Sequence, residues 1–287
     1  MTDTVDPRSQ FAEYVARIIA GKECLTWARS RWHARTGRDI PFVETPLEVA
    51  FNEYKWNKKT FEANSIELSN LQALLRQSLE ECDADALRNV IEKILRWGGV
   101  FRSGNRKWLD SIHREGLLFE NITGALRELQ SSPFTPVSFD AAGYRSNTGL
   151  SKVYSLALSD FAIFDSRVSA ALQLMLWRFA DRHDLPKIPA ELFIHAMPHH
   201  GSVPRRAVYR GCPFPEMRNK TAAHVRSNRI SNHVLSKAIA IARHAEGAEW
   251  CVRHPDALRR VEAALFMVGY HLPPNIAYNF EARRQSR

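Results

Sequence analysis

Helical periodicity is the feature of this sequence that most constrains its fold. Residues 165–183 (DSRVSAALQLMLWRFADRH) place apolar side chains at helical spacing along the whole segment. The same spacing predicts helices over 9–21, as a pair within 65–97, near 119–130, and over 231–245 and 255–268. No convincing run alternates apolar with polar residues in the way that predicts a half-buried strand. The sequence therefore predicts a mainly α fold.

Turn residues define several of the helix ends. Gly21 is expected to end the first helix, Asp83 to cap the second member of the pair, and Gly98-Gly99 to end it. The segment Ser131–Pro136 is expected to break the chain after the helix near 119–130. We expect residues 1–64 to form a helical and irregular N-terminal segment that packs on a helical core of residues 65–287. The pattern over 24–62 does not support an assignment in detail.

The composition is that of a globular protein. The hydrophobic fraction is 45% in a chain of 287 residues, enough for a sizeable core. No stretch approaches the roughly 20 apolar residues that span a bilayer, and the first eight residues lack the basic and apolar regions of a secretion signal. The expectation is a cytoplasmic monomer that is not associated with a membrane.

Basic residues predict a polyanionic partner. The formal net charge is +9 and the pI about 9.6. The segment 198–230 contains seven Arg or Lys and a single acidic residue, Glu216, and Pro and Gly interrupt it repeatedly. We interpret it as a basic loop over a nucleic-acid groove, with Arg205, Arg206 and Arg210 on DNA and with Tyr209 and Phe214 available for base stacking. The alternative is a surface insertion without a function.

Cysteine and histidine spacing argues against a metal centre. The four cysteines are far apart and form no CxxC pair, which also argues against a disulfide scaffold: Cys24, Cys82, Cys212 and Cys251. The histidines nearest to Cys212 fit no common zinc spacing: His195, His199, His200 and His224. Pro198 disfavours a continuous helix through the i, i+4 pair His195 and His199. We expect no metal and no cofactor.

The most informative stretch is 147–172 (NTGLSKVYSLALSDFAIFDSRVSAAL). It predicts a Gly-containing turn, a short apolar helix, a short apolar passage (FAIF) and then Asp165 at the start of the long helix. An Asp in that position caps backbone N–H groups and interacts favourably with the helix dipole. A purely structural cap is the simplest interpretation.

The order of these parts resembles the active-site segment of the helix-hairpin-helix DNA glycosylases. Thr148-Gly149-Leu150-Ser151 resembles the hairpin that presents backbone N–H groups to a DNA phosphate, and Lys152 falls on the position of the catalytic lysine. Residues 161–164 resemble the apolar lead-in, and Asp165 falls on the essential aspartate. The resemblance covers about 26 of the 287 residues. It implies a helix-hairpin-helix glycosylase-like fold.

The chemistry of base excision explains why these residue types would be needed. Cleavage of an N-glycosidic bond develops oxocarbenium character on the sugar, which the carboxylate of Asp165 would stabilise while it orients a nucleophile. Lys152 would add a lyase activity by attack of its amine on C1′, provided that this amine is neutral. A solvated side chain or a phosphate contact is the alternative for Lys152.

The remaining candidates follow from the same interpretation. To reach the bond, the base must leave the stack and enter a pocket, for which we expect Trp97, Asn105, Trp108 and Tyr144, with Trp177 as a further candidate wall. The residues expected on DNA are Arg145, Asn147, Thr148, Gly149, Ser151 and Arg167, besides the arginines of the basic loop. A Trp within a helical stripe is more often a core residue, so a structural role is the alternative for each Trp.

The expected function is excision of a damaged or modified base from double-stranded DNA, leaving an abasic site. The base is an oxidised, alkylated or deaminated one in repair, or a hydroxymethylated or glucosylated cytosine of phage DNA in antiviral defence. One alternative is a helix-hairpin-helix module that binds DNA without catalysis. Another is an RNA-binding or protein-interaction helical domain, with an accidental resemblance.

Overall fold

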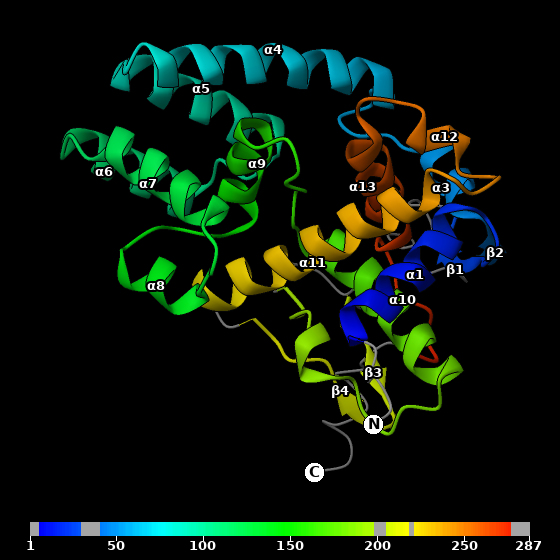
Figure 1. Cartoon of the computed structure of the whole chain (residues 1–287). Helices are drawn as coiled ribbons and strands as arrows, with labels where there is room; N and C mark the ends of the chain where they lie inside the picture. Colours follow the sequence, from blue (N-terminus) through cyan, green and yellow to red (C-terminus); the bar gives the residue numbers. More distant parts are fainter. Residues whose placement is uncertain (1–5, 30–40, 198–204, 218–220, 277–287) are drawn as a thin grey trace. The chain divides into compact units, whose positions relative to one another are not determined.

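The structure is a computed structural model that describes residues 6–29, 41–197, 205–217 and 221–276 (Figure 1). It is mainly helical, as the sequence predicted. The described chain divides into two compact units, of which unit 1 combines 1–54, 165–218 and 229–287, and unit 2 combines 55–164 and 219–228. The units do not follow the expected boundary after residue 64. Within the described residues, every helix is too short or too polar to cross a membrane.

Unit 2 is built around one helix. The helices α4 (Phe61–Glu80), α5 (Ala84–Trp97), α6 (Ser103–Arg114), α7 (Leu118–Gln130), α8 (Pro136–Ala141) and α9 (Thr148–Ala157) follow in chain order. Helix α5 contacts α4, α6, α7 and α9, and Figure 1 shows α4 and α5 side by side. The reason is its strong amphipathicity: Leu87, Ile91, Ile94 and Leu95 are fully buried. The predicted cap is confirmed, since the side chain of Asp83 accepts a hydrogen bond from Ala86 N at 2.9 Å.

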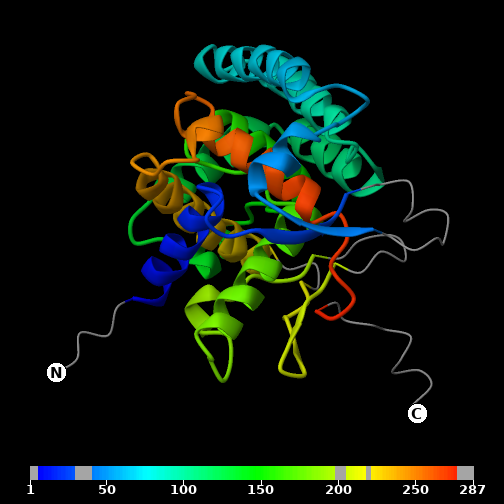
Figure 2. The same cartoon turned by 90° about the vertical axis from the view of Figure 1, so that its right-hand side faces the viewer.

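Unit 1 is centred on two long apolar helices. Helix α10 (Ser166–Arg182) packs on α13 (Ala257–Val268) and on α1 (Pro7–Ile19), where Phe11 and Phe179 meet at 5.4 Å between ring centroids. Helix α3 (Leu47–Asn52) packs against α13, as Figure 2 shows from the side. A 3-10 turn, η1 (Ala190–Leu192), and the short helix α12 (Glu249–Val252) complete this unit together with the later part of α11 (Thr221–Ala242).

Two small antiparallel sheets also belong to unit 1, although no alternating pattern in the sequence predicted strands there. Strand β1 (Leu25–Ala28) pairs with β2 (Phe42–Thr45), in a register that places Trp27 opposite Val43. Strand β3 (Val208–Tyr209) pairs with β4 (Cys212–Pro213) through a two-residue turn. Arg210 and Gly211 form that turn with φ of 47° and 76°, the left-handed conformations that such a turn requires.

The prediction of a basic loop over 198–230 is wrong for its later part. Residues 208–213 form the β3–β4 hairpin, and α11 begins at Thr221 instead of near 231. The described aromatic residues of the segment point inward: Tyr209 is 3% and Phe214 2% exposed, so neither is placed to stack on a base. Residues 198–204 and 218–220, which include His199 and His200, lie outside the described part of the chain.

Candidate functional site

Asp165 immediately precedes helix α10 in unit 1. Its backbone is extended, with φ −124° and ψ −178°, and its Oδ1 accepts hydrogen bonds from Arg167 N at 2.9 Å and Val168 N at 3.0 Å. This is N-cap geometry, and the sequence predicted it. The side chain is half-buried. The carboxylate is therefore held through Oδ1, and neither capping hydrogen bond involves Oδ2.

Two arginines lie around this helix start. The guanidinium carbon of Arg167 is 4.1 Å from the ring centroid of Phe266 and 4.8 Å from that of Tyr270. The guanidinium carbon of Arg205 is 5.5 Å from the Tyr270 centroid. Its Nη1 donates to Ser166 Oγ at 2.8 Å, and its Nε donates to the Tyr270 carbonyl at 3.3 Å. These stacked positions hold both cations beside the first turn of α10.

The close approach of α13 to α10 depends on a glycine. A Cβ at Gly269 would lie 1.7 Å from the carbonyl oxygen of Arg167. Glycine therefore allows the end of α13 to reach the first turn of α10, and it brings Tyr270 under the two arginines. Sequence reasoning predicted a helix over 255–268 but did not connect Phe266 and Tyr270 with the site. The sequence feature that could have indicated this contact is the Gly269-Tyr270 pair directly after that helix, because a glycine allows close approach of another backbone.

Burial sets the electrostatics of this cluster. Burial and, to a smaller extent, the nearby charge of Arg167 lower the pKa of Arg205 to about 10, against a weaker opposing effect of Asp165. The pKa of Arg167 is also lowered by burial, with Asp165 as the main opposing charge. Both groups are still cations at neutral pH.

The other two arginines of the predicted basic loop have intramolecular partners. Arg206 donates through Nε to the Phe214 carbonyl at 2.6 Å and lies 3.7 Å from a Glu216 oxygen. Arg210 is exposed at the hairpin turn, where its ion pair with Asp184 raises the pKa of its guanidinium. Trp177 donates to the Val208 carbonyl at 2.9 Å and meets Tyr209 edge to face, which gives it a structural contact with the same hairpin.

The predicted hairpin residues belong to unit 2, where they start α9. The Asn147 side chain accepts from Gly149 N at 2.8 Å and from Leu150 N at 3.0 Å. These two N–H groups are thus bound within the chain instead of presented to a phosphate. Asn147 also donates to Asn105 Oδ1 at 3.0 Å, and Asn105 donates to the Val100 carbonyl at 2.9 Å. The amide of Asn105 is therefore part of a structural chain of hydrogen bonds.

The polar residues that follow in α9 are buried. Ser151 is fully buried, and its hydroxyl donates to the Phe164 carbonyl at 3.2 Å and accepts from Phe164 N at 3.3 Å. Lys152 is 4% exposed, and its Nζ donates to the Thr148 carbonyl at 3.2 Å. A Cβ at Gly98 would lie 2.4 Å from the Lys152 Cδ, so the lysine stem packs directly over this glycine. Lys152 and Asp165 belong to different units.

His224, which fell in the predicted loop, lies buried in the same unit as Lys152. Its Nδ1 is 2.7 Å from Ser146 Oγ, and its ring meets Phe164 edge to face at 5.4 Å. Burial lowers the pKa of His224, a hydrogen bond with the backbone of Phe164 opposes this shift, and the charge of Lys152 adds to it, so that the pKa is about 3. The ring is neutral over the physiological range. No helical periodicity in the sequence pointed to this residue.

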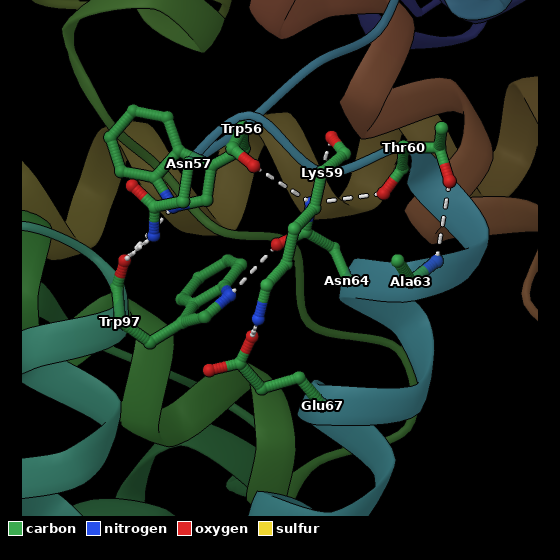
Figure 3. A network of polar contacts seen from close by, with 8 residues as sticks. All are labelled: Trp56, Asn57, Lys59, Thr60, Ala63, Asn64, Glu67 and Trp97. Carbon is green, nitrogen blue, oxygen red and sulfur yellow. Dashed lines mark hydrogen bonds and ion pairs between the residues drawn. The ribbon is translucent and has the colours of Figure 1, made fainter.

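The aromatic residues predicted for a base pocket have different environments within unit 2. Trp97 is 8% exposed, and its indole N–H donates to Asn64 Oδ1 at 3.0 Å (Figure 3). Its carbonyl accepts from the Trp56 indole at 2.9 Å and from Asn57 at 3.1 Å. The structural alternative therefore applies to Trp97. Trp108 and Tyr144 are half-buried. The Trp108 ring centroid is 5.7 Å from the guanidinium carbon of Arg145, and the ring centroids of Tyr144 and Phe139 are 5.4 Å apart.

The chain shows no similarity that would assign it to a family. Protein-family models, curated protein sequences and solved structures were compared with it, and none matches. In the described part of the chain, no group of three or more His, Cys, Asp or Glu side chains is placed to hold a metal ion.

Proposed function

We propose that this protein is a DNA glycosylase with Asp165 as its catalytic carboxylate. The observation that supports the proposal best is the cluster in unit 1: a carboxylate fixed through Oδ1 stands beside two stacked, partly buried arginines. A carboxylate there would stabilise the developing oxocarbenium charge, and the cations would hold the negatively charged backbone nearby. The family resemblance of residues 147–172 supports the same assignment.

The substrate class is double-stranded DNA that carries a damaged or modified base. Repair of an oxidised, alkylated or deaminated base is one form of this proposal. Removal of hydroxymethylated or glucosylated cytosine from phage DNA, as antiviral defence, is the other. Lys152 is the proposed nucleophile of an associated lyase step, although its amine hydrogen-bonds to a backbone carbonyl in this structure. Trp108 and Tyr144 remain the proposed aromatic contacts of the base.

The test is base release by the purified full chain and by Asp165→Asn. Substrates are unmodified duplexes, lesion-containing duplexes and phage DNA with modified cytosines, each scored for abasic sites. Asparagine is also a good N-cap, so the variant should keep the fold of α10. We expect a loss of excision of about a hundredfold or more, the size of effect typical for removal of an electrostatic catalytic group. Strand nicks at the abasic sites would assign the lyase step to an amine such as Lys152.

A matched control exists on another helix. Asp83 caps α5 through the same type of hydrogen bond, to Ala86 N at 2.9 Å, and lies outside the cluster. Asp83→Asn should leave excision unchanged. Full excision by Asp165→Asn would show that the active-site assignment is wrong.

A second candidate function is a DNA-binding module without catalysis. It is favoured by one specific observation, namely that the two hydrogen bonds of Asp165 Oδ1 are those of an ordinary helix cap. This alternative predicts duplex binding that Asp165→Asn does not change, and no base release from any of the DNAs.

A further inference from the structure

The two arginines beside Asp165 form one cationic cluster. We define it as Arg167, Arg205 and the ring of Tyr270, which both guanidinium groups contact. Both guanidinium carbons lie within 5.5 Å of the centroid of that single ring. The residues come from three separate parts of unit 1: the start of α10, the segment before β3 and the residue after Gly269. Their convergence is therefore a property of the folded unit and not of a local sequence motif.

The charges in this cluster do not balance at Arg205. The repulsion from Arg167 acts on its guanidinium more strongly than the attraction from Asp165. Among the described residues, Arg205 makes no ion pair within 4.0 Å, unlike Arg210 and Arg260, which also stack on aromatic rings of this unit. Arg260, for example, stacks on Phe51 at 5.1 Å and also pairs with Asp256 at 3.0 Å. A half-buried cation that faces a like charge is unfavourable unless an anion compensates it.

With respect to the described residues, Arg205 also has donors left for such an anion. A guanidinium carries five N–H groups, and Arg205 donates two hydrogen bonds, to Ser166 Oγ and to the Tyr270 carbonyl. Its planar group is held by these bonds and by the ring, so little side-chain entropy would be lost on binding. A phosphate group is an acceptor that a fixed arginine matches well, because the fork of N–H groups fits two of its oxygens.

We propose that Arg167 and Arg205 bind one phosphate group together, directly beside the carboxylate of Asp165. Two guanidiniums and one carboxylate leave a net charge of +1, which a single phosphodiester neutralises. The phosphate belongs to the DNA backbone next to the excised nucleotide; this choice of source rests on the proposed function, whereas the site itself does not. A free phosphate ester is the other source of the same chemistry.

The first arm of the test uses inorganic phosphate as the probe. Thermal unfolding of the full chain is measured with sodium phosphate and with sodium chloride at equal ionic strength. We expect phosphate to raise the midpoint by about 2–4 °C when it is well above its dissociation constant. Arg205→Gln should lose this shift, and Arg260→Gln, in which a stacked but ion-paired arginine is changed, should keep it. If Arg205→Gln does not fold, Arg205→Lys replaces it and should show a reduced shift, since lysine loses the planar fork.

The second arm measures duplex binding against salt concentration. Each phosphate contact contributes about 0.9 to the slope of log affinity against log salt. Both arginines hold the same phosphate, so each single variant, Arg167→Gln or Arg205→Gln, should lower the slope by about 0.9. The double variant should also lower it by about 0.9, and not by twice that amount, because only one phosphate contact is lost. A phosphate shift in the first arm with unchanged slopes would assign the site to a free phosphate ester.

An equal midpoint in phosphate and chloride would overturn the proposal, and so would slope changes that add up in the double variant. Neither arm requires base excision. A protein that binds phosphate here and releases no base would disprove only the glycosylase proposal, and a glycosylase without the phosphate effect would disprove only this one.

Discussion

At the scale of single residues, this protein buries side chains that are usually exposed or paired. Lys152 and His224 lie in unit 2 at 4% and 2% exposure. Asp165 is both a helix cap and the proposed catalytic carboxylate: its Oδ1 accepts both capping hydrogen bonds, and neither of them uses Oδ2. The sequence predicted the position of Asp165 at a helix start. It did not predict Tyr270, because contacts between residues 65 or more positions apart leave no periodic signal.

The neutral His224 makes the stability of the protein depend on pH. Its pKa is about 3 in the folded chain and near 6.5 when unfolded, so the unfolded state binds the proton first as the pH falls. The contribution to stability is complete above pH about 6.5 and is lost progressively towards pH about 3. Between pH 7 and pH 5 we expect a loss of about 2 kcal/mol in the free energy of unfolding from this residue. Urea unfolding at both pH values measures it.

The variant His224→Gln should show a smaller difference between the two pH values. His244 is exposed, and His244→Gln should keep the dependence of the wild type. An unchanged pH dependence in His224→Gln would show that the ring takes up its proton at the same pH in the folded and the unfolded chain.

At the scale of elements, the start of α9 shows what glycine does in this fold. A Cβ at Gly149 would lie 2.5 Å from Asn105 Nδ2 and 2.7 Å from Leu95 Cδ2. We expect Gly149→Ala to destabilise the protein by about 1–3 kcal/mol, because α9 must move away from α5. Thermal or urea unfolding measures the change. Gly104→Ala, in the first turn of α6, meets only Arg145 at 4.0 Å and should be neutral or stabilising by up to about 1 kcal/mol. Equal effects of the two substitutions would contradict this account.

The elements that sequence reasoning predicted correctly are those with an apolar stripe and a polar cap. Helix α5 satisfies both conditions, with Asp83 before it and Gly98 at its end. The first half of α11 fails the first condition, since its buried residues include His224, Ser227 and Asn228. A helix that buries polar side chains has no hydrophobic periodicity, and this is why residues 221–230 resembled a loop. Helix α6 was missed because Leu109 alone is fully buried among its twelve residues.

At the scale of the whole molecule, charge is the property that sequence determines most directly. The excess of nine positive charges needs no structure to be counted. Its distribution does need one, since Arg206 and Arg210 form ion pairs with carboxylates, whereas Arg205 forms none within 4.0 Å among the described residues. The candidate site also could not be predicted from the sequence alone. The residue types of the cluster were visible in the sequence, but the pairing of Arg205 with Arg167 depends on the packing of α10, α13 and the β3–β4 hairpin within unit 1.

The net charge leads to a prediction that separates the DNA-directed proposals from the third alternative. If several basic side chains contact a duplex, counterion release should lower its affinity by about a thousandfold or more between 50 mM and 200 mM salt for six or more contacts. Fluorescence anisotropy with a labelled duplex and a single-stranded RNA of equal length measures this at each salt concentration. A steep slope for the duplex, and a weaker affinity for the RNA, fits both the glycosylase and the non-catalytic module. Duplex binding that is absent or independent of salt would rule out both, because neither can hold DNA without neutralising its phosphates.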